Sequence, residues 1–193
     1  CKLFGANVSH FVWCNDFAAA RNFNFAQVPS EFDYILWMDS DDAFRGLENL
    51  KKVIKKNPAD AYSFNYLYAF DEFKNPIVVH QKTQVVKNDG CVEWAGALHE
   101  DFKENRELTR YFVKDIERIH LSSPERFEQS KLRNLEVAKA QAYALPNDPR
   151  SYWNLGNSLK ALNRNEEAIE ALDKFLQTSQ SDDEKYIARL RRA

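Results

Sequence analysis

The feature that most constrains the fold of this chain is a continuous apolar run followed directly by acidic residues. Residues 34–38 (YILWM) have the length and composition of a strand, and Asp39, Ser40, Asp41 and Asp42 follow at once. Carboxylates directly after a buried strand lie where open α/β sheets place their binding sites. Carboxylates at positions i and i+2 can converge on one hard cation, and Mg²⁺ and Mn²⁺ prefer such oxygen ligands. The alternative is a solvated acidic loop, but the preceding apolar run favours a cation site.

The rest of the first half continues an α/β pattern. Asp16 is expected to cap a helix over residues 16–27, and a second helix is predicted over residues 47–56. The turn sequence at residues 87–90 (KNDG) predicts a hairpin between the strands on either side of it. The strands that we expect besides residues 34–38 are residues 8–13, 61–70, 77–86, 91–95 and 114–120.

From Pro124 onward the pattern changes to long helices rich in Ala, Leu, Glu, Lys and Arg. One stretch follows the tetratricopeptide pattern, and Tyr186 lies about one 34-residue repeat after Tyr152. The positions that match the pattern are Tyr152, Leu155, Gly156, Leu159, Ala168 and Leu172. Small residues at 156 and 168 would let the two helices of the repeat approach closely. We therefore predict an α/β domain over residues 1–123 and an all-α, tetratricopeptide-like tail over residues 124–193.

Composition excludes several classes of protein. The 193 residues include 27 basic and 29 acidic side chains, and this balance lacks the basic excess typical of a nucleic-acid binder. No apolar run approaches the ~20 residues needed to span a bilayer, and residues 1–5 do not resemble a signal peptide. The three cysteines, at positions 1, 14 and 91, are read as reduced thiols, so we expect a cytoplasmic protein.

Two segments at a characteristic distance carry a resemblance to a known family. Residues 11–22 (FVWCNDFAAARN), followed by residues 33–42 (DYILWMDSDD), resemble family 2 glycosyltransferases of the GT-A fold. The branch with tetratricopeptide repeats after the catalytic domain is the most similar. The resemblance implies a partial GT-A, Rossmann-like mixed sheet and a metal-dependent transfer of sugar from a nucleotide-diphospho-sugar, with UDP-sugars favoured.

The resemblance also implies roles for particular residues. Asp39 and Asp41 match the family's Asp-x-Asp pair, which holds Mn²⁺ or Mg²⁺ and the donor. Arg21 and Asn22 match a pair close to the donor nucleotide. For Arg21 the alternative is an ion pair on a helix surface.

A second segment, residues 96–101 (GALHED), matches the acidic motif that supplies the catalytic base. Glu100 is the first choice for that base and Asp101 the second, because inverting transfer needs a carboxylate to accept the acceptor's proton. The alternative is a pair of acids at a helix start. His120 matches a histidine that completes the metal site, and His99 is the rival ligand.

The family normally begins with a βαβ unit that binds the nucleotide base. Residues 8–13 resemble the strand just before the Arg-Asn helix, so we expect a chain that lacks this N-terminal unit. In the transferase reading, the helical tail would recruit the acceptor, a protein or peptide. A different reading is a catalytically inactive platform whose helical tail binds a partner. A metal-dependent hydrolase or nucleotidyltransferase would also use paired carboxylates, but it leaves the segment around Arg21 and the tail unexplained.

Overall fold

The computed structural model describes residues 5–121 and 123–192, so Cys1 and Ser122 lie outside the described residues. The chain forms two compact units. The sheet unit comprises residues 22–93 and 102–123, and the helical unit comprises residues 1–21, 94–101 and 124–193. The predicted boundary near residue 123 separates the tail from the preceding strand, and as a domain boundary it stays a prediction.

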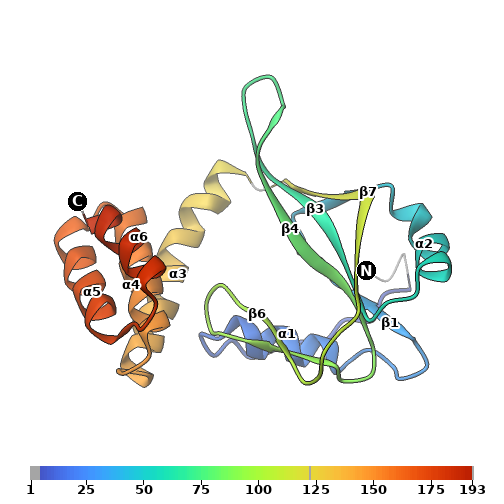
Figure 1. The fold of residues 1–193 in the computed structure, drawn as a ribbon, viewed down its shortest axis with the longest axis horizontal. Helices are drawn as coiled ribbons and strands as arrows, with labels where there is room; N and C mark the ends of the chain where they lie inside the picture. Colours follow the sequence, from blue (N-terminus) through green and yellow to red (C-terminus); the bar gives the residue numbers. More distant parts are fainter. Residues whose placement is uncertain (1–4, 122, 193) are drawn as a thin grey trace. The chain divides into compact units, whose positions relative to one another are not determined.

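The sheet unit contains a five-stranded sheet of order β1-β4-β3-β7-β2 (Figure 1). β3 runs parallel to β7, and the other neighbours are antiparallel. A long β3–β4 hairpin extends beyond the other strands in Figure 1. The strands are β1 (Tyr34–Leu36), β2 (Asp42–Arg45), β3 (Ala61–Phe70), β4 (Pro76–Lys87) and β7 (Arg110–His120).

Both faces of β3 are buried, because alternate residues of a strand point to opposite faces. Tyr62 and Phe64 belong to a cluster against which the apolar residues of η2 (Leu47–Asn49) and α2 (Leu50–Lys56) pack. Ala61 belongs to the opposite cluster, to which the end of α1 contributes Phe25. β1, by contrast, is only half-buried and lies at the edge of the sheet, so it is not the buried strand that the apolar run indicated.

The N-terminal part confirms one prediction and corrects another. α1 (Phe17–Phe25) begins after Asp16, whose Oδ1 accepts a hydrogen bond from the backbone N–H of Ala19 at 2.9 Å. Residues 8–13 form no strand, and Val12 is 89% exposed. Apolar β-branched residues favour a strand only where a neighbouring strand pairs with them, and no described strand does so here.

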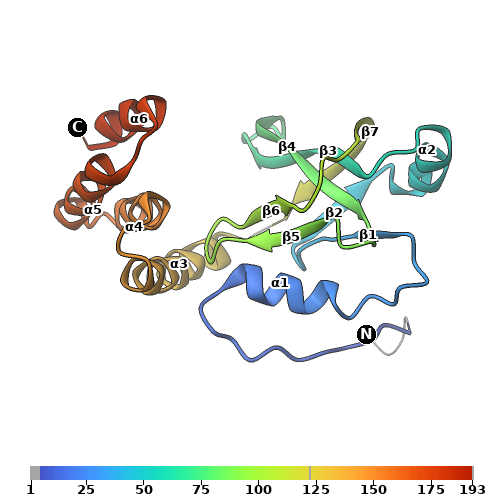
Figure 2. The same cartoon turned by 60° about the horizontal axis from the view of Figure 1, so that its bottom comes forward.

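The hairpin predicted across residues 87–90 is also wrong. The chain does turn there, with Gly90 at a φ of 73°, but β5 (Val92–Ala95) pairs with β6 (Asp101–Glu104) (Figure 2). The end of β4 has no free edge, because Val86 faces Ile35 of β1 on one side and Ala61 of β3 on the other. The following strand therefore has to pair elsewhere.

The helical unit contains α3 (Pro124–Ala144), α4 (Pro149–Ala161), α5 (Asn165–Thr178) and α6 (Asp182–Arg192), in the region predicted to be helical. Asp148 caps α4 by accepting hydrogen bonds from the backbone N–H groups of Arg150 and Ser151. A Cβ atom at Gly156 would lie 2.8 Å from Cγ of Leu172, so α4 and α5 approach closely because residue 156 has no side chain. This is the contact for which the sequence predicted small residues.

The helices of this unit also bury a loop from the middle of the sequence. Leu98 packs against Val137 and Ala138 of α3. Asn154 of α4 donates a hydrogen bond from Nδ2 to the Leu98 carbonyl oxygen at 3.3 Å. The middle of this loop, at Leu98, is therefore held by α3 and α4.

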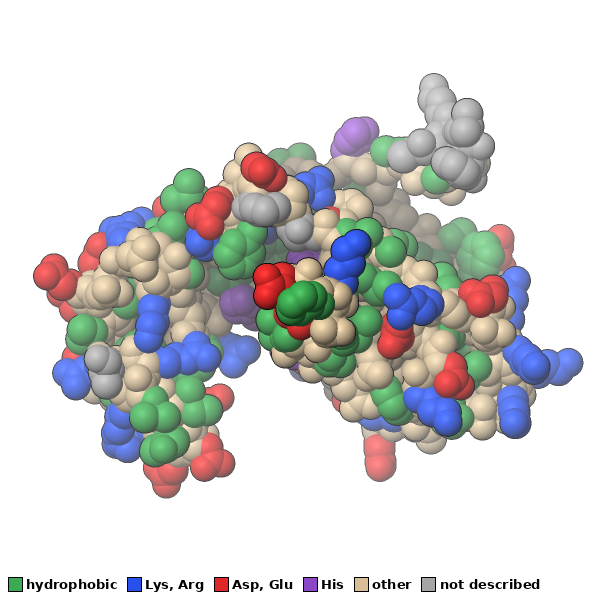
Figure 3. All heavy atoms as spheres, turned by 90° about the horizontal axis from the view of Figure 1, so that it is seen from above, with side chains coloured by type: hydrophobic (Ala, Val, Ile, Leu, Met, Phe, Trp, Pro, Cys, Tyr) green, Lys and Arg blue, Asp and Glu red, His purple; other side chains and the backbone are tan. Residues whose placement is uncertain are grey.

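The surface carries charges of both signs. Acidic and basic side chains are interspersed over the face shown in Figure 3, as the formal net charge of −2 leads one to expect. None of the helices formed by the described residues combines the length and the apolar character that a membrane span requires.

Candidate functional site

The acidic loop, residues 39–42, connects β1 to β2 at one end of the sheet. It begins with a turn in which the Asp42 N–H donates to the Asp39 carbonyl oxygen at 3.2 Å. Asp42 then pairs with His120 in the β2–β7 ladder. Leu121 continues this contact by donating from its N–H to the Asp41 carbonyl oxygen at 2.7 Å. β2 was not predicted, and it is the element that carries the acids to the end of β7.

Three side chains of this region could hold a metal ion. Ligand atoms of Asp41, Asp42 and His120 all lie within 4.8 Å of one another. Two of the three predicted ligands, Asp41 and His120, belong to this group, and Asp42 stands in it where Asp39 was predicted. Carboxylate oxygens suit Mg²⁺ and Mn²⁺, whereas an imidazole nitrogen suits Mn²⁺ better than Mg²⁺. The donor set therefore fits a divalent cation of the predicted kind.

Asp42 has both of its carboxylate oxygens engaged within the protein. Oδ1 accepts a hydrogen bond from the Tyr66 hydroxyl at 3.2 Å and lies 3.4 Å from Nδ1 of His120. Oδ2 accepts from Nε of Arg118 at 2.8 Å and from the Asp39 N–H at 3.0 Å. Burial raises the pKa of Tyr66, so its phenol stays protonated and can donate. Asp42 therefore links β3, β7 and the acidic loop, in addition to belonging to the group that could hold a metal ion.

Arg118 is the buried cation of this site, and it was not predicted. Its side chain is 1% exposed, and its guanidinium lies over the Trp37 ring at 4.5 Å and the Tyr66 ring at 4.2 Å. Nη2 donates to Oδ2 of Asp39 at 2.7 Å. The alternation of faces along a strand could have indicated that residue 118 is buried. It lies two positions from the fully buried Ile116 and therefore on the same face of β7.

Aromatic side chains surround His120. The ring of Tyr68 stacks on the His120 ring with centroids 5.0 Å apart and an interplanar angle of 4°. The aromatic residues at alternate positions of β3 are mostly core, because Tyr62, Phe64 and Tyr66 are buried. Tyr68 is the exception at 42% exposed.

The helical unit holds the second group of predicted residues. Nε of Arg21, on α1, donates to Oε1 of Glu100 in an ion pair whose two side chains are mostly buried. The Arg21 guanidinium also lies 4.9 Å from the centre of the buried Trp94 ring. Arg21 thus does form an ion pair, as the alternative reading expected, and this pair joins α1 to the loop that follows β5. Asn22, the next residue, belongs to the sheet unit, where it lines a pocket of about 260 Å³ with Lys87 and Asn88.

The alternative reading of Glu100 and Asp101, as a pair of acids at the start of a helix, is wrong. No helix begins there, and Asp101 is instead the exposed first residue of β6. The exposed His99 has a φ of 54°, a left-handed conformation that is uncommon for a residue with a side chain. The structure therefore gives Glu100 a fixed, mostly buried position and leaves Asp101 at the surface.

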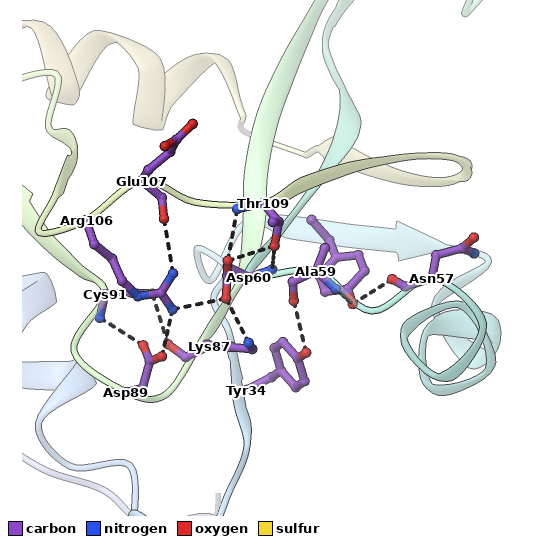
Figure 4. A network of polar contacts seen from close by, with 11 residues as sticks. Tyr34, Asn57, Ala59, Asp60, Lys87, Asp89, Cys91, Arg106, Glu107 and Thr109 are labelled. Atoms are coloured by element: carbon purple, nitrogen blue, oxygen red, sulfur yellow. Dashed lines mark hydrogen bonds and ion pairs between the residues drawn. The ribbon is translucent and has the colours of Figure 1, made fainter.

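A further polar network lies in the sheet unit and was not predicted (Figure 4). The Asp60 carboxylate pairs with Nζ of Lys87 at 2.8 Å and with Nη2 of Arg106 at 3.0 Å. It also accepts hydrogen bonds from the backbone N–H and the hydroxyl of Thr109. These contacts, Arg106 first, hold the pKa of Asp60 far below its ordinary value. The network joins the start of β3, the end of β4 and the loop before β7.

The mixed sheet, its flanking helices and the acidic loop beside His120 fit a partial GT-A-like fold. Comparison with protein families agrees, because the family model described as Glycosyl transferase family 2 matches residues 3–107, more than half of the chain. The chain belongs to this family.

Two curated relatives extend the match to most of the sequence. The chain is 23% identical over 183 residues to the SPbeta prophage-derived glycosyltransferase SunS of Bacillus subtilis (strain 168). It is equally similar to the glycosyltransferase SunS of Bacillus phage SPbeta. The matched region covers 91% of this chain but 42% of each relative, so the chain spans less than half of their length.

Proposed function

We propose that the chain carries the cation ligands and the catalytic base of a glycosyltransferase. This enzyme would move a sugar from a nucleotide-diphospho-sugar to an acceptor with inversion. The observation that carries this proposal is the group formed by Asp41, Asp42 and His120 at the end of β2 and β7, in a chain of glycosyl transferase family 2. UDP-sugars are the first donors to consider. The glycosyltransferase names of the two relatives support the reaction class.

Asp41 and His120 would hold Mn²⁺ or Mg²⁺, with Asp39 as the third ligand. Asp39 is suited to this role because its side chain is 40% exposed even while Arg118 binds one of its oxygens. When bound, the cation offsets the negative charge that develops on the leaving diphosphate. His99 remains the rival ligand to His120.

Glu100 would act as the base, and Asp101 is the second choice. As the acceptor's nucleophilic atom attacks the anomeric carbon, the bond to the diphosphate breaks and the carboxylate takes the acceptor's proton. Arg21 supports this role because its guanidinium fixes the position of the Glu100 carboxylate. Arg21 and Asn22 would also lie next to the donor nucleotide.

The helical tail would bind the acceptor, a protein or peptide, through tetratricopeptide-like repeats. A hollow of about 160 Å³ on α3, α4 and α5 supports this part of the proposal. Its lining includes Tyr152, Leu155 and Leu159 together with acidic and basic side chains. The same hollow favours the second candidate function, a catalytically inactive platform that binds a partner through its helices.

Calorimetric titration of UDP-sugars and GDP-sugars, with and without Mn²⁺, separates the two candidates. A transferase should bind one donor only with Mn²⁺ present, and Asp41→Asn should abolish that binding while the circular dichroism spectrum stays unchanged. Glu72→Gln, which removes an exposed acid in the β3–β4 turn, is the matched control and should bind normally. Cation-independent binding, or normal binding by Asp41→Asn, would remove the cation assignment, and an absence of all donor binding would favour the platform.

A further inference from the structure

Arg118 connects three elements through one side chain. Its guanidinium binds Asp42 on β2 through Nε and Nη2, Asp39 in the acidic loop through Nη2, and Gln84 on β4 through Nη1 at 3.2 Å. The rings of Trp37 and Tyr66 contact the same guanidinium, so they restrict its rotation as well as its displacement. An arginine in such a position has little freedom to move.

A buried guanidinium is costly unless its hydrogen-bonding groups find partners. Here the partners that carry charge are two carboxylates of one four-residue loop. The planar fork of arginine can bind several acceptors at fixed angles, whereas a lysine ammonium acts as a point charge. The arrangement therefore holds the loop in one conformation in addition to balancing its charge.

We propose that Arg118 is a positioning residue that orders the acidic loop for cation binding. By binding Asp42 and one oxygen of Asp39, it fixes the acidic loop next to His120. The cation part of this inference rests on the proposed function, whereas the ordering of the loop does not. Partners of metal ligands typically change metal affinity about 10-fold to 100-fold when they are altered.

The test uses Arg118→Lys, which keeps the positive charge but loses the fork. Two readouts are measured on the full chain: hydrogen exchange of the peptide over residues 37–45 without metal, and the dissociation constant for Mn²⁺ by electron paramagnetic resonance. We expect faster exchange in this peptide and Mn²⁺ binding weakened about tenfold or more. Arg45→Gln is the matched control on the same pair of strands, because it removes only the exposed Arg45–Glu117 ion pair, and it should change neither readout.

Wild-type exchange and wild-type Mn²⁺ affinity in folded Arg118→Lys would overturn the proposal. If this variant does not fold, Asp39→Ala replaces it, since the more exposed Asp39 can lose its link to Arg118 without leaving a cavity. Faster loop exchange in Asp39→Ala then supports the proposal, and unchanged exchange overturns it. If the wild-type chain binds no Mn²⁺, the proposed cation site fails, and loop exchange alone decides the role of Arg118.

Discussion

At the scale of single residues, Glu100 and Arg21 form the contact on which the proposed chemistry depends. The pair joins residues 79 positions apart in the sequence, and the buried Trp94 ring backs the guanidinium. A glutamine at position 100 could still accept the hydrogen bond from Arg21 but could not take a proton. Substitution at this position therefore separates the placement of the loop from the proton transfer.

Glu100→Gln is expected to leave the donor dissociation constant within about threefold and to lower kcat by about 100-fold or more, the usual contribution of a general base. Donor titration and a sugar-transfer assay under the same conditions measure the two quantities. Asp101→Asn, which changes an exposed acid on β6, should keep near-normal turnover. If Asp101→Asn loses activity and Glu100→Gln does not, the base is Asp101.

Asp60 sets a pH dependence of stability. Its pKa is lower in the folded chain than the ~3.9 of an unfolded aspartate, chiefly because of Arg106 and then Lys87. A depressed pKa contributes stability that is fully present above the unfolded value and declines as the pH falls below it. Asp60→Asn should therefore lower the melting temperature at pH 7, and its difference from the wild type should narrow steadily below about pH 4. Melting curves between pH 2 and 7 test this, with the exposed Asp115→Asn as the control; a difference independent of pH would contradict it.

The site shows which residue roles a sequence can reveal. Asp41 was singled out by the apolar run before it and His120 by the family resemblance, and the structure places the two side chains together. Asp42 and Arg118 were missed because their importance lies in pairing with each other across 76 positions, which no local pattern records. Strand periodicity could have shown only that residue 118 faces inward.

At the scale of elements, long periodic segments were predictable and pairings were not. β3 begins and ends at the predicted residues, and the tail is helical as predicted. The predicted strand at residues 8–13 and the predicted hairpin across residues 87–90 were wrong, because strand formation depends on which neighbouring strands are available. The short β2 and β6 strands, four residues each, carry too little pattern to stand out.

The α4–α5 contact makes a prediction about Gly156. A side chain there meets the buried Leu172, so Gly156→Val should cost about 1–3 kcal/mol through overpacking. Chemical denaturation followed by circular dichroism measures the cost. Glu170→Val places the same β-branched residue on the exposed face of α5 and should lose only about 0.5 kcal/mol of helix propensity. Equal losses in the two variants would show that the close approach is unimportant.

At the scale of the whole molecule, the order of segments in the sequence differs from their grouping in space. The helical unit contains the tail together with residues 94–101, so the loop that carries Glu100 depends on helices that follow it in the chain. Leu98, two residues before Glu100, packs on Val137 and Ala138 of α3. The tail therefore supports the loop of the proposed base, in addition to carrying the hollow that we propose for the acceptor.

Val137→Ala tests this support from a distance in the sequence. Val137 is fully buried against Leu98, so removing its two methyl groups should loosen the loop and cost about 1–3 kcal/mol of stability. We expect kcat for transfer to fall several-fold while donor affinity stays unchanged, because the donor is proposed to contact other residues. Leu132→Ala makes a similar truncation on the same helix, but Leu132 is 62% exposed, so both kcat and stability should stay near the wild-type values. If Val137→Ala lowers stability yet transfers sugar at the wild-type rate at a temperature where it is folded, α3 stabilises the unit without positioning Glu100, and the tail's role in transfer would then be confined to the acceptor.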